Sequence, residues 1–263
     1  MFRNISFMQM KNRNNENPYL TERRLFDLHS HVLPGIDDGS VDVTEAISML
    51  KLAYENGIGF MIATPHFYPR ENTPEQFMCN RDASVDKLLE AIKNEGVKEI
   101  PHLGLGAEVA FFKGMSRSTA LEKLCIQGTR LILIEMPFTR WSAAILDDLL
   151  GIKTVLGLVP VIAHLDRYLQ YQDEDILSEV LSGEVLIQIN ASSIENNKKS
   201  KRILKMVGDG EIDFLGSDCH NLTDRAPDMH LAIDTIEKKF GREALEEFEK
   251  FGNFALADAI KII

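Results

Sequence analysis

The stretch that decides the fold is residues 43–66, VTEAISMLKLAYENGIGFMIATPH. Its first part, Val43–Asn56, spaces apolar residues as on one face of a helix, and Gly57 is a typical residue directly after a helix end. Ile58–Ala63 is then a short, continuous apolar run, which is typical of a buried parallel strand. A helix, a tight turn and a buried strand in succession indicate an α/β protein.

The same alternation continues along the chain in both directions. Seven apolar runs are predicted strands: Leu25–Leu28, Ile58–Ala63, Ile100–Leu105, Leu131–Ile134, Gly157–Ala163, Val185–Ile189 and Ile212–Leu215. Seven such β-α units close most economically into a TIM-like (β/α)7 barrel. An open doubly wound sheet is the alternative, although no GxGxxG or GxxxxGK[ST] loop follows any predicted strand.

The two ends of the chain differ in character. Residues 1–24 are Asn-rich and mildly basic, and we predict a loosely ordered N-terminal arm there. The tail from Asp228 onward predicts two or three further helices, divided at Gly241 and Gly252. No linker interrupts the intervening chain, so residues 25–263 are predicted to form one domain.

Composition excludes several classes of protein. The formal net charge of −11 argues against nucleic-acid binding, because phosphate backbones are bound by an excess of Lys and Arg. No apolar run is long enough for membrane insertion, and the N-terminus lacks a secretory signal. Cys79, Cys125 and Cys219 show no CxxC spacing, which indicates a reducing compartment and a cytoplasmic protein.

Histidines and carboxylates follow the predicted strands, where the carboxyl ends of a parallel barrel converge on one face. Five of the seven histidines fall at these positions. The candidates are His29, His31, Asp38 in the turn beyond them, His66, Glu108, Glu135, His164, Asp218 and His220. Taken singly, each has a simpler interpretation, such as a buried histidine, a rim ion pair for Glu135 or a helix cap for Asp218.

Together these residues favour a metal centre. His29 and His31 alternate along a strand and so face the same side, where two imidazoles can bind one cation. Imidazole nitrogens and carboxylate oxygens without a thiolate favour Mn, Fe or Zn. Nine candidate ligands are too many for one ion, which indicates two or three ions that share a bridging carboxylate.

Six segments carry a family resemblance, in this order: DLHSH with the IDDG turn, TPH, GAE, IEMPF, VIAHLDRY and SDCHNLTDR. They resemble the motifs of the PHP (polymerase and histidinol phosphatase) superfamily, from about Asp27 to the C-terminus. Within it the chain is similar to the bacterial manganese-dependent tyrosine-protein phosphatases of capsule and exopolysaccharide operons. The departures are the N-terminal arm and Cys219, and neither touches a predicted ligand.

The resemblance implies a distorted barrel with three Mn²⁺ ions at its rim. It assigns His29, His31, Glu108 and Asp218 to the first ion. It assigns Glu108, Glu135 and His164 to the second ion, and Asp38, His66 and His220 to the third. It also implies that Arg167 and Arg225 bind the phosphate.

The implied reaction is hydrolysis of phosphotyrosine by a hydroxide that bridges two ions. The implied substrate is a phosphotyrosyl protein, namely a bacterial tyrosine kinase that controls capsular polysaccharide synthesis. Two alternatives stay open: a small-molecule phosphatase of the histidinol-phosphate type, and a PHP barrel that has become a non-catalytic regulatory module. The metal content and the preferred substrate would distinguish them.

Three further features have competing interpretations. Cys219 and Arg225 stand at the C-x5-R spacing of cysteine-dependent tyrosine phosphatases, but the intervening residues lack glycine and include a carboxylate. Phe138, Arg140 and Trp141 follow the fourth strand and either line the rim or pack in the core. The segment 67–77 after His66 is predicted to contact the substrate or act as a lid.

Overall fold

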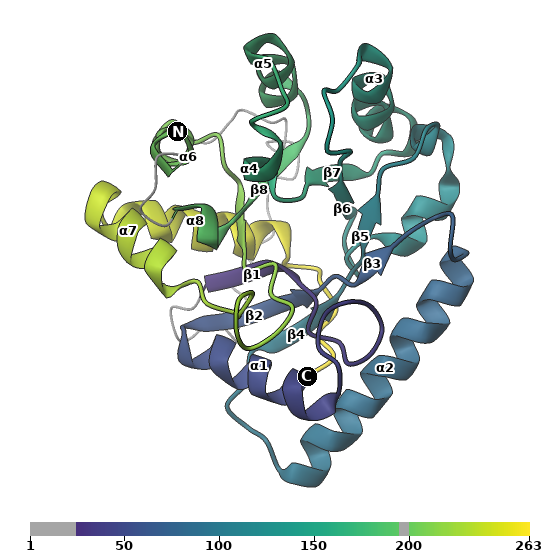
Figure 1. Cartoon of the computed structure of the whole chain (residues 1–263), viewed down its shortest axis with the longest axis vertical. Helices are drawn as coiled ribbons and strands as arrows, with labels where there is room; N and C mark the ends of the chain where they lie inside the picture. Colours follow the sequence, from purple (N-terminus) through teal and green to yellow (C-terminus); the bar gives the residue numbers. More distant parts are fainter. Residues whose placement is uncertain (1–24, 195–199) are drawn as a thin grey trace.

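The computed structural model describes residues 25–194 and 200–263, so the predicted arm over residues 1–24 lies outside the described residues. The strands are β1 (Leu25–Ser30), β2 (Ile58–Ala63), β3 (His66–Phe67), β4 (His102–Leu105), β5 (Glu108–Ala110), β6 (Leu131–Glu135), β7 (Val159–Ile162), β8 (Leu186–Asn190) and β9 (Phe214–Gly216). The α-helices are α1 (Val43–Glu55), α2 (Pro74–Glu95), α3 (Ala143–Gly151), α4 (Leu165–Tyr168), α5 (Glu174–Ser182), α6 (Ser200–Gly208), α7 (His230–Phe240) and α8 (Arg242–Ala255). The strands lie at the centre and the helices surround them (Figure 1).

All strands pair in parallel, in the orders β1-β2-β4 and β3-β5-β6-β7-β8-β9. The two sheets meet between β1 and the residues after β9. There Ser30 and Cys219 form a parallel bridge, and the His31 amide donates to the Cys219 carbonyl over 2.9 Å. The result is a curled parallel sheet, and the predicted barrel-like α/β class is confirmed.

Two of the seven predicted strands are each followed, after a break of two residues, by a short strand that was not predicted: β3 after β2 and β5 after β4. Thr64 and Pro65 separate β2 from β3, and Gly106 and Ala107 separate β4 from β5. Proline lacks the N–H that a continuing ladder needs, so the strand bends at Pro65. Beyond the bends, β3 and β5 pair with His66 opposite Glu108. The interruptions therefore bring two predicted ligands side by side.

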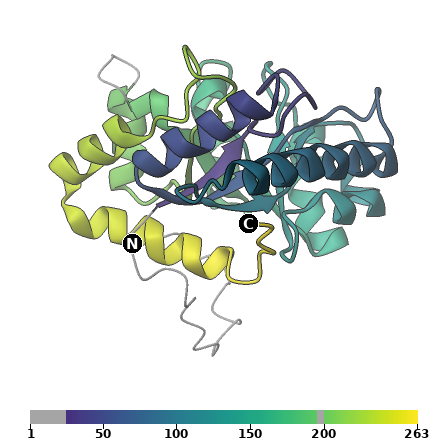
Figure 2. The same cartoon turned by 90° about the horizontal axis from the view of Figure 1, so that it is seen from below.

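Alternate residues of the strands fill the interior of the curled sheet with apolar side chains, among them Phe26, Leu28 and Val161. Phe251 and Ala255 of α8 pack against this inner cluster. Figure 2 shows α8, in yellow, on the side opposite the loop that follows β1. Helix α8 thus closes one end of the curled sheet, and the carboxyl ends of the strands form the other.

The predicted helix break at Gly252, and with it a third helix over residues 253–263, is wrong. Helix α8 continues through Gly252 to Ala255. A Cβ at Gly252 would lie 2.6 Å from Cδ2 of Phe26, so this glycine allows the helix to approach the sheet closely. The chain turns at residues 256–258 instead, and the Ile262 amide donates to the Leu103 carbonyl beside β4.

Among residues 25–194 and 200–263, no helix combines the length and the apolar character needed to cross a bilayer.

Candidate metal centre

All nine predicted ligand side chains lie in one connected cluster at the carboxyl ends of the strands, and Glu108 stands at its centre. Its Oε2 atom lies 2.8 Å from Nδ1 of His66, 3.3 Å from Nε2 of His29 and 3.4 Å from Nε2 of His31. Its Oε1 atom lies 2.8 Å from Nε2 of His164. One buried carboxylate therefore touches four imidazoles from three strand regions, namely the end of β1, the start of β3 and the end of β7.

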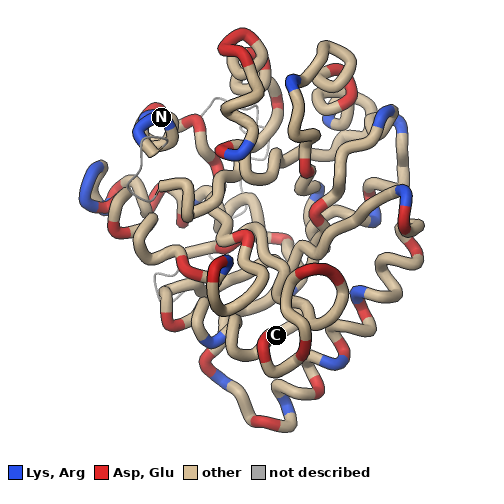
Figure 3. Tube along the Cα trace, viewed as in Figure 1, with Lys and Arg blue, Asp and Glu red and all other residues tan. Residues whose placement is uncertain are grey.

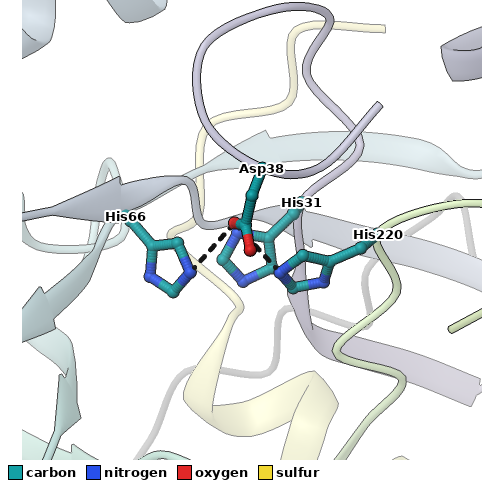
Figure 4. Close-up of side chains that lie close together, drawn as sticks. All are labelled: His31, Asp38, His66 and His220. Atoms are coloured by element: carbon teal, nitrogen blue, oxygen red, sulfur yellow. Dashed lines mark ion pairs between the residues drawn. The ribbon is translucent and has the colours of Figure 1, made fainter. Parts of the chain in front are cut away.

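The outer part of the cluster is built around Asp38 (Figure 4). Oδ1 of Asp38 lies 3.3 Å from Nε2 of both His66 and His220. The His31 ring lies against them, with its centroid 4.0 Å from that of His220. Asp38 is 67% exposed whereas His31 and His220 are buried, so Asp38 marks the mouth of the site.

The inner part of the cluster joins both members of the HxH pair to Asp218. The Nε2 atoms of His29 and His31 are 3.1 Å apart, and each lies 3.6 Å from Oδ1 of Asp218. On another side, Oε1 of Glu135 lies 3.8 Å from Nε2 of His164. The cluster is thus larger than a single cation requires.

The donor atoms fit several cations. Four groups have ligand atoms within 4.8 Å of one another: His31, Asp38, His66 and His220; His29, Glu108 and His164; His29, His31 and Asp218; and His66, Glu108 and Glu135. Within the described chain, the buried atoms Glu108 Oε2, His66 Nδ1 and His220 Nε2 lie near oppositely charged groups but make no hydrogen bond of good geometry. Such atoms cost about 1–3 kcal/mol each if left unsatisfied, and cations would satisfy them.

The four geometric groups do not coincide with the three ligand sets that the resemblance implies, and His31 and Glu135 show the difference. His31 lies with Asp38, His66 and His220, in addition to its contact with His29. Glu135 lies in one group with His66 and Glu108 as well as close to His164. Both residues therefore lie close to the donor atoms of more than one group.

The pKa values show how the charges of the histidines and carboxylates compensate one another without cations. Although burial disfavours the imidazolium form, Glu108 and Asp218 raise the pKa of His29. Burial acts in the same direction on His31, but hydrogen bonds to Asp37 and Glu108 raise its pKa to about 10. Despite its own burial, Glu108 has a pKa well below the usual value because of these histidines. Protons thus occupy positions that cations would take.

Two ligand residues adopt left-handed backbone conformations. His164 has a φ of 31° and Asp218 a φ of 52°, and they are the only non-glycine residues with positive φ in the described chain. This region of φ is unfavourable for side chains other than glycine. Their backbone amides are held, that of His164 by Gln188 Oε1 at 2.7 Å and that of Asp218 by the His29 carbonyl at 2.8 Å.

Both predicted phosphate-binding arginines contact the same predicted metal ligand, Asp218. Nη2 of Arg167 lies 2.6 Å from Oδ2 of Asp218, and Nη2 of Arg225 lies 2.8 Å from Oδ1. Each arginine side chain is about one third exposed, at 36% and 32%. Two guanidinium groups therefore stand at the edge of the cluster and face solvent as well as the site.

Two amide side chains that sequence reasoning missed join three ligands. Oε1 of Gln188 lies 3.2 Å from Nδ1 of His29 and accepts from the His164 amide, while its Nε2 donates to Asn190 Oδ1 over 3.1 Å. Asn190 Nδ2 in turn donates to Asp218 Oδ2 over 2.8 Å. The two residues alternate on β8, as the HxH pair does on β1, and this polar alternation in a buried strand was the available signal.

Asp37, next to Asp38 in the sequence, also orients two of the predicted ligands. Its Oδ2 atom lies 2.7 Å from Nδ1 of His31 and accepts from the His66 amide over 3.0 Å. Although burial opposes its ionisation, the hydrogen bond from His31 lowers the pKa of Asp37 to about 2. Carboxylates that hold the second nitrogen of a ligand histidine fix its tautomer and ring orientation.

The C-x5-R spacing does not form a nucleophile site. Cys219 is fully buried, and its burial, followed by the charge of Asp27, raises the pKa of its thiol. A nucleophilic cysteine needs the opposite shift and an accessible thiolate. Arg225 binds Asp218, as described above. Cys219 is a small residue that closes the sheet against Ser30.

Three predicted rim residues follow β6, the fourth predicted strand, and of these only Phe138 lies at the surface of the site. Trp141 is buried and donates from Nε1 to the Pro137 carbonyl over 3.0 Å. Arg140 is exposed and pairs with Asp173 at the surface. Phe138 is 44% exposed and stacks on the His164 ring.

The fold and the cluster of histidines and carboxylates define a metal-dependent hydrolase. Residues 25–252 match the family model for capsular polysaccharide synthesis proteins, CpsB/CapC. The chain belongs to this family, and the predicted relationship to the tyrosine phosphatases of capsule operons is confirmed.

Individual relatives agree with this membership. The chain is 31% identical to the tyrosine-protein phosphatase YwqE of Bacillus subtilis over 229 residues, which cover 83% of this chain and 86% of that one. It is 29% identical to the tyrosine-protein phosphatase CpsB of Streptococcus agalactiae over 234 residues, covering 83% and 92%. Among solved structures, one from a study of YwqE from Bacillus subtilis and CpsB from Streptococcus pneumoniae, described as metal-dependent tyrosine phosphatases, superimposes with a TM-score of 0.74. It is 25% identical and the match covers 90% of this chain and 96% of that chain.

Proposed function

We propose that this protein is a metal-dependent protein-tyrosine phosphatase that hydrolyses phosphotyrosine monoesters. The observation that carries the proposal is the meeting of Arg167 and Arg225 at Asp218, inside a cluster with donor atoms for several cations. Cations and guanidinium groups together suit a phosphate dianion. The relatives named above carry the same activity in their names.

The proposed ligand sets follow the family pattern. His29, His31, Glu108 and Asp218 would hold one ion. Glu108, Glu135 and His164 would hold a second ion, and Asp38, His66 and His220 a third. We propose Mn²⁺ as the native metal because the chain resembles manganese-dependent enzymes. The donor atoms alone would also suit Fe or Zn. When bound, such ions lower the pKa of water toward about 7 and neutralise phosphate charge.

The local charge of the site outweighs the acidic character of the whole chain. Asp and Glu residues are spread along the whole described chain trace (Figure 3), and the formal net charge is −11. Salt screens exposed charges beyond about 8–10 Å. The two arginines and the cations would lie within contact distance of the phosphate. A dianionic substrate is therefore attracted to the rim despite the overall charge.

The residues of the chain bind and orient the phosphate. Arg167 and Arg225 flank Asp218 from its two oxygens, so a phosphate beside Asp218 meets both planar donor groups. Bidentate donors stabilise the charge of the equatorial oxygens while the attacking and leaving oxygens stay in line. The leaving tyrosine has a phenol pKa of about 10, so its departure needs no dedicated general acid.

We propose that the substrate is a bacterial tyrosine kinase that regulates capsular or exopolysaccharide synthesis, and that the protein acts in the cytoplasm. The family model, which is named for capsular polysaccharide synthesis, supports the first part. The three cysteines, which are all free, support the second.

A comparison of two substrates tests the proposal. Protein reconstituted with Mn²⁺ should hydrolyse a phosphotyrosyl peptide with a kcat/KM far above that for histidinol phosphate. The reverse preference would identify a small-molecule phosphatase of the same superfamily. Fewer than one bound ion per chain, with no turnover of either substrate, would identify a non-catalytic module.

A further inference from the structure

Two exposed aromatic side chains stand directly on imidazoles of the site. Tyr68 is 36% exposed, and its ring stacks on His66 with centroids 5.2 Å apart and planes 27° apart. Phe138 is 44% exposed and stacks on His164 at 6.0 Å and 18°. Among the large apolar side chains exposed by a third or more in the described residues, these two alone stack on a site imidazole. We call this pair the aromatic lip.

The aromatic lip flanks the central carboxylate. His66 contacts Oε2 of Glu108 and His164 contacts Oε1, each over 2.8 Å. Each of these imidazoles carries one ring of the lip. The two rings therefore belong to opposite sides of Glu108, and a substrate that reaches this carboxylate enters beside them.

Strand alternation explains the position of Tyr68. His66, Phe67 and Tyr68 follow one another at the end of β3, and Phe67 is buried against Phe77 with ring centroids 5.4 Å apart. Since alternate residues point the same way, burial of Phe67 directs Tyr68 to the side of His66. The Tyr68 carbonyl accepts from the amides of Glu71 and residue 72, which fixes the turn beyond it.

Phe138 is also presented by a braced loop. Trp141 donates from its indole to the Pro137 carbonyl, and Gln172 donates to the Thr139 carbonyl over 2.8 Å. The Phe138 ring also packs against buried Tyr168, with centroids 5.0 Å apart. Both rings are thus held in place although more than a third of each stays in water. A fixed, exposed apolar group beside a buried polar site is typical of a ligand contact.

We infer that the aromatic lip contacts the phenyl ring of phosphotyrosine and selects aryl over short alkyl phosphomonoesters. The inference rests on the proposed function. His29, Glu108 and His164 are almost fully buried, so the phosphate must descend below the rim to reach them. In phosphotyrosine a phenyl ring separates the phosphate from the peptide backbone and would lie at the level of the lip. The short side chain of phosphoserine has no ring to place there.

The test compares substrates and an inhibitor across matched variants. Tyr68→Ala, Phe138→Ala and the double variant are loaded with Mn²⁺, and their kcat/KM is measured on a phosphotyrosyl peptide and on the same peptide with phosphoserine. Competitive inhibition by inorganic phosphate is measured in parallel, because this ion reaches the metals and arginines without an aryl ring. Tyr68→Phe keeps the ring. Tyr171→Ala is the control, since Tyr171 is 39% exposed but stacks on no site imidazole in the described chain.

We expect Tyr68→Ala and Phe138→Ala each to lose about threefold to tenfold in kcat/KM on the phosphotyrosyl peptide alone. The inhibition constant of phosphate should change by less than about twofold, and Tyr171→Ala should resemble the wild type. Tyr68→Phe should recover most of the kcat/KM that Tyr68→Ala loses, because it keeps the ring. An unchanged double variant, or an equal loss for phosphate inhibition and for the phosphoseryl peptide, would overturn the inference while the proposed function stands. A wild-type protein without turnover of the phosphotyrosyl peptide would overturn both.

Discussion

Asn190 donates a hydrogen bond of 2.8 Å to Asp218, and it is the last residue of β8, a strand that supplies no predicted ligand. Through Gln188 the same chain of hydrogen bonds reaches His29 and the backbone of His164. Strand β8 therefore contributes residues that orient predicted ligands on other strands. Partners of this kind typically tune metal affinity by orienting the ligands.

Replacement of this amide should weaken metal binding while the fold is kept. For Asn190→Leu we expect the dissociation constant of Mn²⁺ to rise about 10–100-fold, because Asp218 loses a fixed orientation. Equilibrium dialysis with metal analysis measures it. Asn56→Leu is the matched control, since this amide donates to the Pro227 carbonyl outside the site. An equal change in both variants would contradict the assigned role.

The arginines should act on phosphate and leave the metal content unchanged. Arg167→Lys and Arg225→Lys keep the positive charge but lose the planar pair of donors, so we expect kcat/KM to fall about 100-fold for each. Arg130→Lys is the control, because Arg130 binds the carbonyls of Leu156 and Gly157. A fall in bound metal parallel to the fall in activity would assign these arginines to the metal ligands instead.

Cys219→Ser should retain most of the activity. The backbone of Cys219 pairs with Ser30, and its thiol is buried. Burial raises the pKa of this thiol, which excludes a thiolate near neutral pH. The expected loss is less than about threefold, whereas EDTA should abolish turnover and Mn²⁺ should restore it. Complete loss in the serine variant, together with activity that resists EDTA, would establish a cysteine-dependent phosphatase.

Metal affinity should rise with pH. Glu108 and Asp218 raise the pKa of His29, and the pKa of His31 is raised to about 10, so the His31 imidazole carries a proton at pH 7. Since only the neutral imidazole binds a cation, affinity should increase about tenfold per pH unit for each proton displaced. Dissociation constants of Mn²⁺ at three pH values check this, and constants that do not change with pH would refute it.

Without metal, the same shift should make stability depend on pH in the opposite direction. A histidine whose pKa is higher in the folded state than in the unfolded state stabilises the fold. The contribution is complete at pH values below the unfolded-state pKa of about 6.5. This contribution is lost as the pH rises through about 10, the folded-state value of His31. Thermal melts of EDTA-treated protein should therefore shift downward between pH 7 and pH 10, and melts of Mn²⁺-loaded protein should shift less.

Gly252→Ala should destabilise the protein although alanine favours helices. The added methyl would stand 2.6 Å from the Phe26 ring, and overpacking of this kind costs about 1–3 kcal/mol. We expect the Tm to fall by about 2–6 °C, with partial recovery when Phe26 is also changed to Leu. Lys250→Ala, at a side chain that is 76% exposed on the same helix, is the control. Equal melting temperatures for the wild type, Gly252→Ala and Lys250→Ala would contradict the close contact.

Much of the fold and the membership of the cluster followed from local patterns. Short apolar runs located seven strand positions, because a buried parallel strand must be apolar on both faces. The ligand candidates were visible because convergence at the carboxyl ends of the strands is a property of any parallel barrel. Short strands such as β3 and β5 were missed, since two or three residues carry no periodicity.

The amino-acid sequence by itself determined which side chains stand at the strand ends, since alternation along each strand is a local property of the backbone. Only the tertiary structure decided how they meet: the curl of the sheet and the interruptions at Pro65 and Gly106 set Glu108 among four imidazoles. It also decided that Gly252 lies within a helix, because the reason for this glycine is a ring from β1 that is distant in the chain. Contacts between residues far apart depend on the register and closure of the whole sheet, and no local pattern encodes them.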